Sequence, residues 1–336
     1  MSVTLHDIAR ETGLSTSTIS KYINGVKLKE RNRIAVEQAI EKLGYTVNEY
    51  ARGLKSNRSR TIGVVIPELS NLFISNIISH MEESLRSAGY SIIVSDCHSD
   101  ERLEAEAVQF LLRKMVDGIV NMPVCRDGRH LLPALEKDVP VVLIDRNIPE
   151  LSERVNGVFI DNETAAYQAT RRLIDEGHRR IGIIIGPSEV YTSHCRLSGY
   201  RKALEEAGIE PDEELIVYSD YTVQGGYTGV RHLVRTRENM TALFITNYEM
   251  TLGGIIAINE LQIPVPQKLS VIGFDNMDLS RITHPKLSIV VQPLQDIGSE
   301  AAKLLLEQLS DEAGPSRTVQ FPVSIHEGES VAPPFA

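Results

Sequence analysis

A segment near the N-terminus gathers short hydroxyl side chains and one cation at helical spacing. They share the outward face of a predicted helix and are Thr16, Ser17, Ser20 and Lys21. A lysine ammonium donates to the O6 and N7 atoms of guanine, whereas serine and threonine hydroxyls read bases less selectively or hold phosphates. This set suits the major groove of DNA. A polar solvent-exposed face on a small helical domain has the same composition, and that interpretation stays open at this point.

A second set of polar residues follows apolar runs that are predicted to be strands. It consists of four strand-end residues and one arginine at a predicted helix start: Asn121, Asp145, Asn247, Asp275 and Arg196. Carboxylates, amides and a guanidinium suit a polyhydroxy ligand, because each hydroxyl group both donates and accepts a hydrogen bond. A buried partner left unmatched costs about 1–3 kcal/mol. For any single strand-end aspartate, capping of the following helix is an equally good interpretation.

The first set is positioned by short helices and a tight turn. Leu5, Ile8 and Ala9 share one face of a first helix, which Thr4 is placed to cap and Gly13 to end. After a turn, Ser15 is placed to cap a second helix, which predicts a helix-turn-helix. The inner face of the second helix is expected to carry Ile19, Tyr22 and Ile23. A third helix, predicted over Arg31–Leu43, is expected to contribute Ile34, Ile40 and Leu43 to the core.

The second set is positioned by apolar runs that alternate with helical stretches. This alternation is typical of βαβ units in parallel, doubly wound sheets that are buried on both faces, and it predicts an α/β fold of two Rossmann-like lobes. Ligands of such folds lie outside the carboxyl ends of the strands. The predicted strands are Ile62–Ile66, Ser91–Ser95, Gly118–Asn121, Val139–Ile144, Gly157–Ile160, Arg180–Ile185, Leu215–Tyr218, Ala242–Thr246 and Ser270–Phe274.

Charge is distributed unequally along the chain, whose formal net charge is −10. Residues 1–60 hold 11 lysines and arginines and 6 acids, so they carry +5 and the remainder carries −15. A basic segment on an acidic body is typical of a nucleic-acid-binding module joined to a soluble domain. We therefore expect DNA contacts to be confined to the first sixty residues.

Composition argues against several other classes of protein. The 336 residues include no apolar run of the about 20 residues that a membrane span needs, and the first residues do not resemble a signal peptide, so we expect a cytoplasmic protein. Cys97, Cys125 and Cys195 lie far apart and are expected to be reduced thiols. There is no Cys/His spacing for zinc, no GxGxxG or GxxxxGK[ST] motif, and no motif of an activated nucleophile. We therefore expect no metal, no cofactor and no enzymatic activity.

A string of motifs closely resembles the LacI/GalR family of bacterial repressors. It comprises Val3-Thr-Leu-x-Asp-Ile-Ala9, Gly13-Leu-Ser-x-x-Thr-Ile-Ser-x-x-Ile-Asn-Gly25, Leu43-Gly-Tyr45, Ala51-Arg-Gly-Leu54 and Ile62-Gly-Val-Val-Ile-Pro67. The resemblance covers essentially the whole chain. It implies a helix-turn-helix headpiece over residues 1–46, a hinge helix and linker over 47–60, and a periplasmic-binding-protein-like sensor. The sensor lobes would span 61–160 plus 292–320 and 161–291 plus 321–336, with crossovers near Asp161, Val291 and Phe321.

The resemblance also implies which residues contact DNA. Thr16, Ser17 and Lys21 occupy base-reading positions, and other headpiece contacts are expected at Thr4, His6, Ser15, Thr18, Ser20 and Asn24. The expected hinge contacts are Asn48, Ala51, Leu54 and Lys55. Leu54 would act as an apolar wedge that unstacks one base step in the minor groove. Without DNA, residues 48–59 are too few and too polar to form a stable helix.

Four residues depart from the family pattern. Lys21 stands where arginine is usual, which removes a bidentate donor. Lys29 replaces the hydroxyl residue that usually caps the third helix, and Glu49 brings an acid close to phosphates. Tyr248 replaces an aspartate beside the ligand. These departures bear on the operator sequence and on the choice of sugar rather than on DNA binding itself.

The strand ends and the resemblance together give a set of effector-binding residues. They are Leu69, Ser70, Asn71, Phe73, Asn121, Asp145, Arg196, Tyr221, Asn247, Asp275 and Gln292. The resemblance implies a homodimeric repressor that binds pseudo-palindromic operator DNA and responds to a small-molecule effector, a sugar or sugar derivative, held between the lobes. A sugar-binding protein without a regulatory role would share the two-lobed body, and a cleft enzyme would use the same carboxylates.

Overall fold

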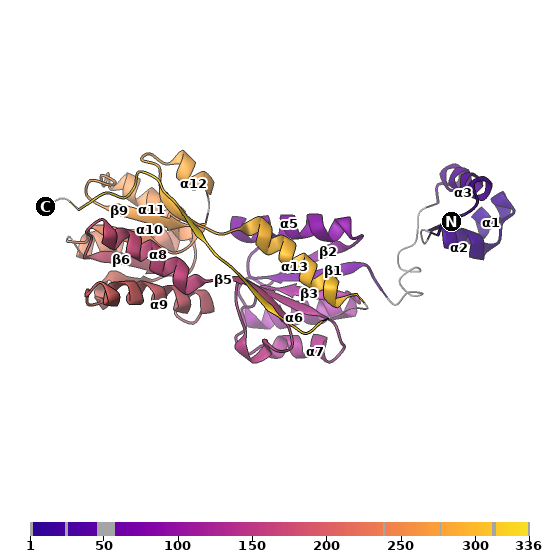
Figure 1. Ribbon diagram of the computed structural model, residues 1–336, viewed down its shortest axis with the longest axis horizontal. Coiled ribbons are helices and arrows are strands. Elements are labelled where there is room, and N and C mark those ends of the chain that lie inside the picture. The colour runs from indigo at the N-terminus through magenta and orange to yellow at the C-terminus, as the bar shows by residue number, and fades with distance from the viewer. Residues whose placement is uncertain are drawn as a thin grey trace. The chain divides into compact units, whose positions relative to one another are not determined.

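The computed structural model describes residues 3–23, 26–45, 58–237, 239–275, 277–310 and 314–334. The chain divides between Ser59 and Arg60 into two compact units (Figure 1). No helix within the described ranges is both long enough and apolar enough to cross a membrane.

The N-terminal unit has three helices in its described residues: α1 (Leu5–Thr12), α2 (Thr16–Ile23) and α3 (Glu30–Leu43). The expected start of α1 is confirmed, because the Asp7 carboxylate accepts hydrogen bonds from the backbone N–H and the hydroxyl of Thr4, at 2.9 and 2.7 Å. Gly13 ends α1 with a φ of 68°, a left-handed conformation that costs glycine little. The N–H of Thr18 donates to Ser15 Oγ at 3.3 Å, so Ser15 caps α2 as expected.

The core of the N-terminal unit differs in one respect from the expected core. Its buried residues are Ile8, Ile19, Val36 and Ala39. Ile34, which the sequence placed in this core, is 41% exposed. Val36, Ala39, Ile40 and Leu43 follow the spacing of one helical face, whereas Ile34 lies two residues before Val36 and so points to the other side.

Two six-stranded sheets form the centres of two lobes in the C-terminal unit. The first sheet is parallel throughout and consists, in order, of β11 (Thr318–Phe321), β5 (Asn156–Ile160), β4 (Val141–Ile144), β3 (Gly118–Asn121), β1 (Thr61–Ile66) and β2 (Ser91–Asp96). The second consists of β12 (Ser324–His326), β10 (Ser288–Val291), β9 (Ser270–Phe274), β8 (Ala242–Ile245), β6 (Ile181–Ile185) and β7 (Ile216–Tyr218). In the second sheet, β12 pairs with β10 in antiparallel orientation and the other pairs are parallel.

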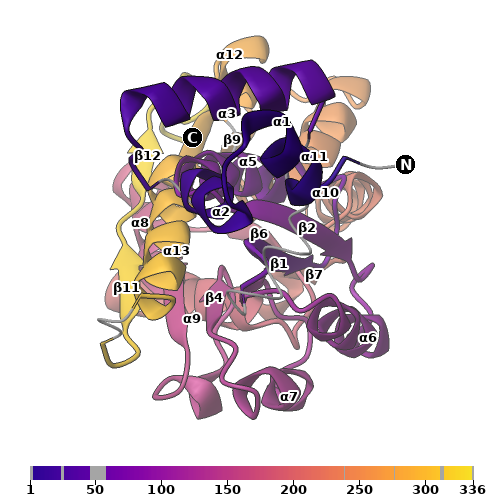
Figure 2. The ribbon, with the colours of Figure 1, turned by 90° about the vertical axis from the view of Figure 1, so that its right-hand side faces the viewer.

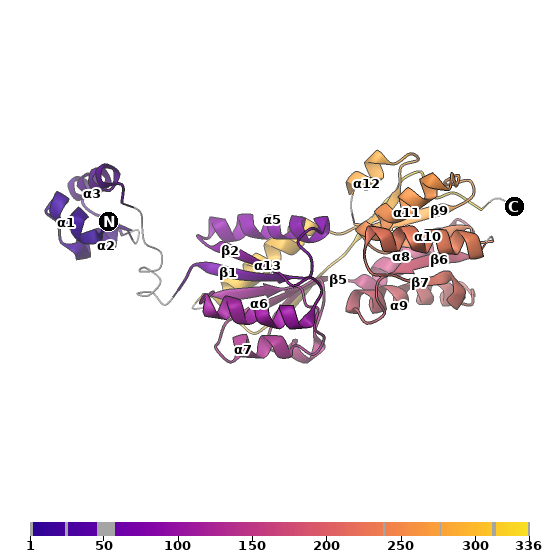
Figure 3. The same cartoon turned by 180° about the vertical axis from the view of Figure 1, so that it is seen from behind.

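Helices cover both faces of each sheet, which confirms the predicted doubly wound α/β fold (Figure 3). One face of the first sheet packs against α5 (Leu72–Ser87) and α13 (Leu294–Gln308), and the other face packs against α6 (Glu101–Arg113) and α7 (Leu132–Leu135). One face of the second sheet packs against α8 (Asn162–Asp175) and α9 (Tyr191–Glu206), and the other face packs against α10 (Val223–Thr236) and α11 (Tyr248–Glu260). The short α12 (Met277–Ile282) follows β9, and 3₁₀ turns occur at Arg129–Leu131, Pro149–Leu151 and Glu213–Leu215. Burial on both faces explains the unbroken apolar runs of the strands.

The chain passes three times between the two sheets within the described residues. β5 leads to α8 through Asp161, and β10 leads to α13 through Gln292 and Pro293. The last passage joins β11 to β12, which lie at an edge of the first and the second sheet respectively (Figure 2). Gln292 and Asp161 therefore stand at connections between the lobes.

Candidate functional sites

The outward face of α2 carries hydroxyl groups in mutual contact. Ser15 Oγ lies 2.9 Å from Thr18 Oγ1 and 3.3 Å from Ser17 Oγ. Lys21 is exposed, while Ile19 on the other side of the helix is buried. Thr16 and Ser20 are half-buried. The helix thus presents hydrogen-bonding groups and one cation on the side away from the core, which is what a helix in the major groove requires.

A polar contact that the sequence did not suggest joins α2 to α3. The Tyr22 hydroxyl donates to Glu37 Oε1 at 2.7 Å, and Arg33 Nη1 donates to both oxygens of the same carboxylate, at 2.7 and 2.8 Å. The hydrogen bond from Tyr22, together with Arg33, lowers the pKa of Glu37. The contact fixes the rotation of α2 on α3. Only the Arg33–Glu37 spacing of four residues was visible in the sequence.

The other expected DNA contacts fall into two groups. Thr4 and His6 are exposed at the start of α1. Five residues lie outside the described part of the chain: Asn24, Asn48, Ala51, Leu54 and Lys55.

A buried arginine lies at the carboxyl ends of the strands of the second sheet. Arg196, on α9, is 4% exposed. Its Nε donates to Asn162 Oδ1 at 2.9 Å and its Nη1 donates to the carbonyl of Thr246. The guanidinium carbon lies 4.0 Å from the centroid of the Phe274 ring. These contacts hold the guanidinium in one orientation, as a binding residue requires.

A buried carboxyl group lies in the same site. Asp275 follows β9, is 8% exposed and accepts a hydrogen bond from Gln292 Nε2. Burial raises the pKa of Asp275 to about 6, and the charge of Arg196 acts in the opposite direction. Asp145, which follows β4 of the first sheet, also raises this pKa. Carboxyl groups of both lobes therefore act on one site, and such a site favours a ligand that supplies hydrogen-bond donors.

The start of α11 adds two more polar residues. Asn247 Oδ1 caps the helix by accepting from the N–H of Met250 at 2.9 Å, and Asn247 Nδ2 donates to Glu249 at 2.7 Å. Burial raises the pKa of Glu249 to about 7, and Asp275 adds to the effect. A hydrogen bond from Asn71 of the other lobe lowers the same pKa. Glu249 was not among the expected residues, although its position two residues after a strand-end asparagine was a usable signal.

Four expected effector residues have other contacts. Leu69 and Ser70 are exposed, and Ser70 donates to Glu68 at 2.7 Å. Phe73 is half-buried against the core of the first lobe. The Tyr221 hydroxyl lies 2.5 Å from Ser193 Oγ. Among the contacts of the described residues, no hydrogen bond joins these four to the site of Arg196 and Asp275.

Asn121 lies in a different polar network, inside the first lobe. Its side chain is completely buried; Nδ2 donates to Glu104 at 3.0 Å, and Oδ1 lies 2.8 Å from His130 Nε2. Glu104 also accepts from the backbone N–H groups of Val124 and Cys125, at 2.9 and 2.7 Å. Both ends of the Asn121 amide are therefore committed within the protein. The strand-end position that suggested an effector contact instead serves to hold the loop after β3.

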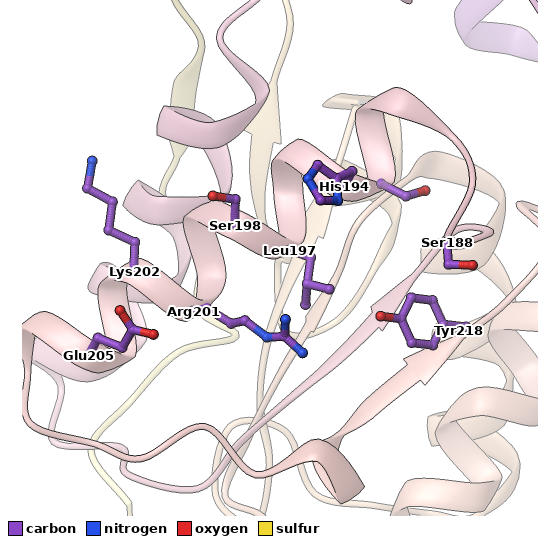
Figure 4. A pocket seen from close by; sticks show the side chains of 9 residues that line it. Ser188, His194, Leu197, Ser198, Arg201, Lys202, Glu205 and Tyr218 are labelled. Carbon is purple, nitrogen blue, oxygen red and sulfur yellow. The ribbon is translucent and has the colours of Figure 1, made fainter. Parts of the chain in front are cut away.

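A surface pocket of about 450 Å³ lies beside α9, between this helix and the end of β7 (Figure 4). Its lining residues include Ser188, His194, Leu197, Ser198, Arg201, Lys202, Glu205 and Tyr218. Arg201 pairs with Glu213 at 2.6 Å, and Lys202 lies 3.6 Å from Glu163. Because both cations are paired with acids, the pocket has no excess positive charge, and we assign it no ligand.

The fold and these sites define a class of protein: a helix-turn-helix unit joined to a two-lobed sensor. Residues 4–48 match the family described as bacterial regulatory proteins, lacI family, and residues 170–331 match a periplasmic binding protein-like domain. Catabolite control protein A of Priestia megaterium is 37% identical over 324 residues, which cover 96% of this chain and 97% of that protein.

Solved structures give the same result. The complex of the transcriptional regulator CelR with cellobiose has a TM-score of 0.74 at 30% identity, over 98% of this chain and 99% of that chain. The lac repressor dimer bound to operator and the anti-inducer ONPF has a TM-score of 0.86 at 25% identity, over 99% of this chain and 100% of that chain. The chain belongs to the lacI family. It is a DNA-binding transcriptional repressor with a sugar-binding type of sensor domain, and its relatives are regulators rather than enzymes.

Proposed function

We propose that this protein is a dimeric repressor whose affinity for operator DNA is set by a sugar or sugar derivative bound between its lobes, and that it acts in the cytoplasm. The observation that carries the proposal is the buried set of Arg196, Asp275 and Gln292 at the strand ends of the second sheet. The charge of Asp145, which follows a strand of the first sheet, raises the pKa of Asp275. The cellobiose bound to CelR, a structural neighbour of similar length, supports a carbohydrate effector.

The proposed effector site contains five polar residues at its centre: Asp145, Arg196, Asn247, Asp275 and Gln292. Leu69, Ser70, Asn71, Phe73 and Tyr221 would line it when the lobes close on a ligand. Asn121 would lie outside this site, because its amide is bonded to Glu104 and His130. Such a ligand changes DNA affinity only to the extent that it binds the two lobe arrangements with different affinity.

On DNA, α2 would read bases in the major groove through Thr16, Ser17 and Lys21. The hinge would insert Leu54 into the central base step of the minor groove. Two headpieces related by a dimer axis need two half-sites, so the operator is expected to be pseudo-palindromic. The lac repressor dimer on its operator is the structural neighbour that supports this arrangement.

Selection of DNA by the purified chain tests the DNA-binding half of the proposal. We expect the bound pool to share a pseudo-palindrome, and a sequence-independent pool whose binding is lost with added salt would contradict specific recognition. Light scattering of the unbound protein should give twice the chain mass. If the protein binds a sugar but selects no DNA sequence, the result favours a sugar-binding protein without a regulatory role.

Titration with a panel of sugars tests the sensor half. The protein–operator complex is followed by fluorescence anisotropy while each sugar is added. An effector is expected to change the operator affinity by roughly 5–150-fold, the usual range of coupling between sites. A sugar that the protein converts to a product, without any change in operator affinity, would instead support a cleft enzyme.

A further inference from the structure

Three side chains with metal-binding groups converge on the carboxyl edge of the first sheet, outside the proposed effector set. Glu68 follows β1, Asp96 ends β2, and His98 follows two residues later. Each offers one ligand atom, and the three atoms all lie within 4.8 Å of one another. The cluster was not predictable from the sequence, because Glu68 is distant in the chain from the other two residues.

The register of two parallel strands brings the cluster together. Ile66 pairs with Asp96 at the end of the β1–β2 ladder. Beyond that pair the backbone contacts continue, since the N–H of Cys97 donates to the carbonyl of Ile66 and the N–H of Ser99 donates to the carbonyl of Pro67, both at 2.9 Å. Glu68 and His98 each stand two residues beyond the last pair. They are therefore neighbours for a reason built into the sheet.

The distances suit a tetrahedral cation. His98 Nδ1 lies 3.3 Å from Asp96 Oδ1. Two ligands bound at about 2.0–2.1 Å in a tetrahedral zinc site lie roughly 3.3–3.4 Å apart. Glu68 is exposed, so its side chain can make the small adjustment that brings its carboxylate to the same distance.

Charge and orientation also favour a cation. Within the described residues, neither the Glu68 nor the Asp96 carboxylate forms an ion pair with a lysine or arginine. Asp96 Oδ2 accepts from the N–H of Leu69 at 2.9 Å, and Glu68 Oε1 accepts from the Ser70 hydroxyl at 2.7 Å. Hydrogen bonds of this kind orient carboxylate ligands around a metal.

We propose that Glu68, Asp96 and His98 bind a divalent transition-metal ion of the zinc type. One imidazole with two carboxylates is a ligand set that selects zinc-like cations over magnesium or calcium, which prefer oxygen ligands alone. A bound ion ties the segment after β1 to the segment after β2. Leu69, Ser70 and Asn71 follow Glu68 directly, so the ion restrains the start of α5.

The test is titration of the chelator-treated full-length protein with Zn²⁺ by isothermal calorimetry. His98→Asn removes the imidazole while keeping a residue that tolerates the left-handed backbone there, where φ is 48°. Glu68→Gln removes a charge and keeps an acceptor for Ser70. We expect one saturable equivalent of Zn²⁺, bound at least about tenfold more weakly by each variant. His232→Ala, an exposed histidine on α10, is the matched control and should bind as the unaltered chain does.

Cobalt distinguishes this site from the cysteines. Co²⁺ bound by imidazole and carboxylates gives visible d–d absorption without the charge-transfer band of a thiolate ligand. The proposal is overturned by absent saturable binding, by equal affinity in His98→Asn, by a thiolate band, or by Mg²⁺ that competes at equal concentration. Circular dichroism of each variant establishes that a loss of binding does not come from unfolding.

Discussion

Replacement of Asp275 by asparagine should separate the stability of the sensor from its ability to bind an effector. Burial raises the pKa of Asp275 from 3.8 to about 6, although Arg196 opposes the effect. A carboxyl whose pKa is higher in the folded state than in the unfolded state binds its proton more tightly when folded. Ionisation of Asp275 therefore lowers stability. The contribution of Asp275 to stability is greatest below the unfolded value of 3.8 and is lost as the pH rises through about 6.

The size of the effect follows from the two pKa values. A change from 3.8 to about 6 corresponds to about 3 kcal/mol at pH 7. Asparagine keeps an acceptor for Gln292 and carries no charge. Since Arg196 then faces no carboxylate at this position, part of the gain is offset. We expect Asp275→Asn to raise the free energy of unfolding by about 1–3 kcal/mol at pH 7 and by under about 1 kcal/mol at pH 4.

Urea unfolding at both pH values measures the change in the free energy of unfolding. Titration of the same variant with the effector should show an affinity reduced at least about tenfold, as expected for loss of a charge-assisted hydrogen bond. The control is Asp175→Asn, an exposed aspartate on α8 that pairs with Arg171, for which we expect a change within about 0.5 kcal/mol. A variant that is less stable than the unaltered chain at pH 7, or equally stabilised at both pH values, would refute the reasoning.

Three further substitutions probe the hinge, the effector site and the packing of the second lobe. Leu54→Ala should weaken specific operator binding by about 1–3 kcal/mol without changing effector affinity, because the wedge into the base step is lost; unchanged operator affinity in a gel-shift titration removes the wedge. Arg196→Ala should abolish the effector response and leave basal operator binding, and a normal response in anisotropy would place the site elsewhere. Gly226→Ala should lower thermal stability by about 1–3 kcal/mol, because a Cβ there would lie 2.0 Å from the carbonyl oxygen of Met250 on α11. An unchanged melting temperature would mean that the two helices separate without cost.

The α/β fold was predictable because its strands are buried on both faces and so read as apolar runs. Each of the nine predicted runs contains a strand. Their ends were less certain: β4 begins at Val141 rather than Val139, since Pro140 has no N–H to contribute to the ladder. Strands β10, β11 and β12 were not predicted. The edge strands β11 and β12 are short and partly exposed, so polar residues interrupt their pattern.

The candidate sites were predictable where one residue type at a strand end was enough. Asp275 and Arg196 act on one site. The partners that hold Arg196, Asn162 and Thr246, come from other elements and carry no local signal. Asn121 also stands at a strand end, but in the structure it belongs to a buried hydrogen-bond network inside the first lobe. The difference is made by Glu104 and His130, which reach Asn121 only in the folded chain. Residue type at a strand end thus indicates polarity at the sheet edge but does not indicate the partner.

The residues that hold the proposed effector site stand at the connections between the lobes. Asn162, which accepts a hydrogen bond from Arg196, directly follows the passage at Asp161. Gln292, which donates to Asp275, lies in the passage from β10 to α13. A ligand bound to Arg196 and Asp275 would share these side chains with the two contacts, and so would act beside two connections at once. A ligand whose bonds to these residues differ between two lobe arrangements would prefer one arrangement by that difference in binding free energy.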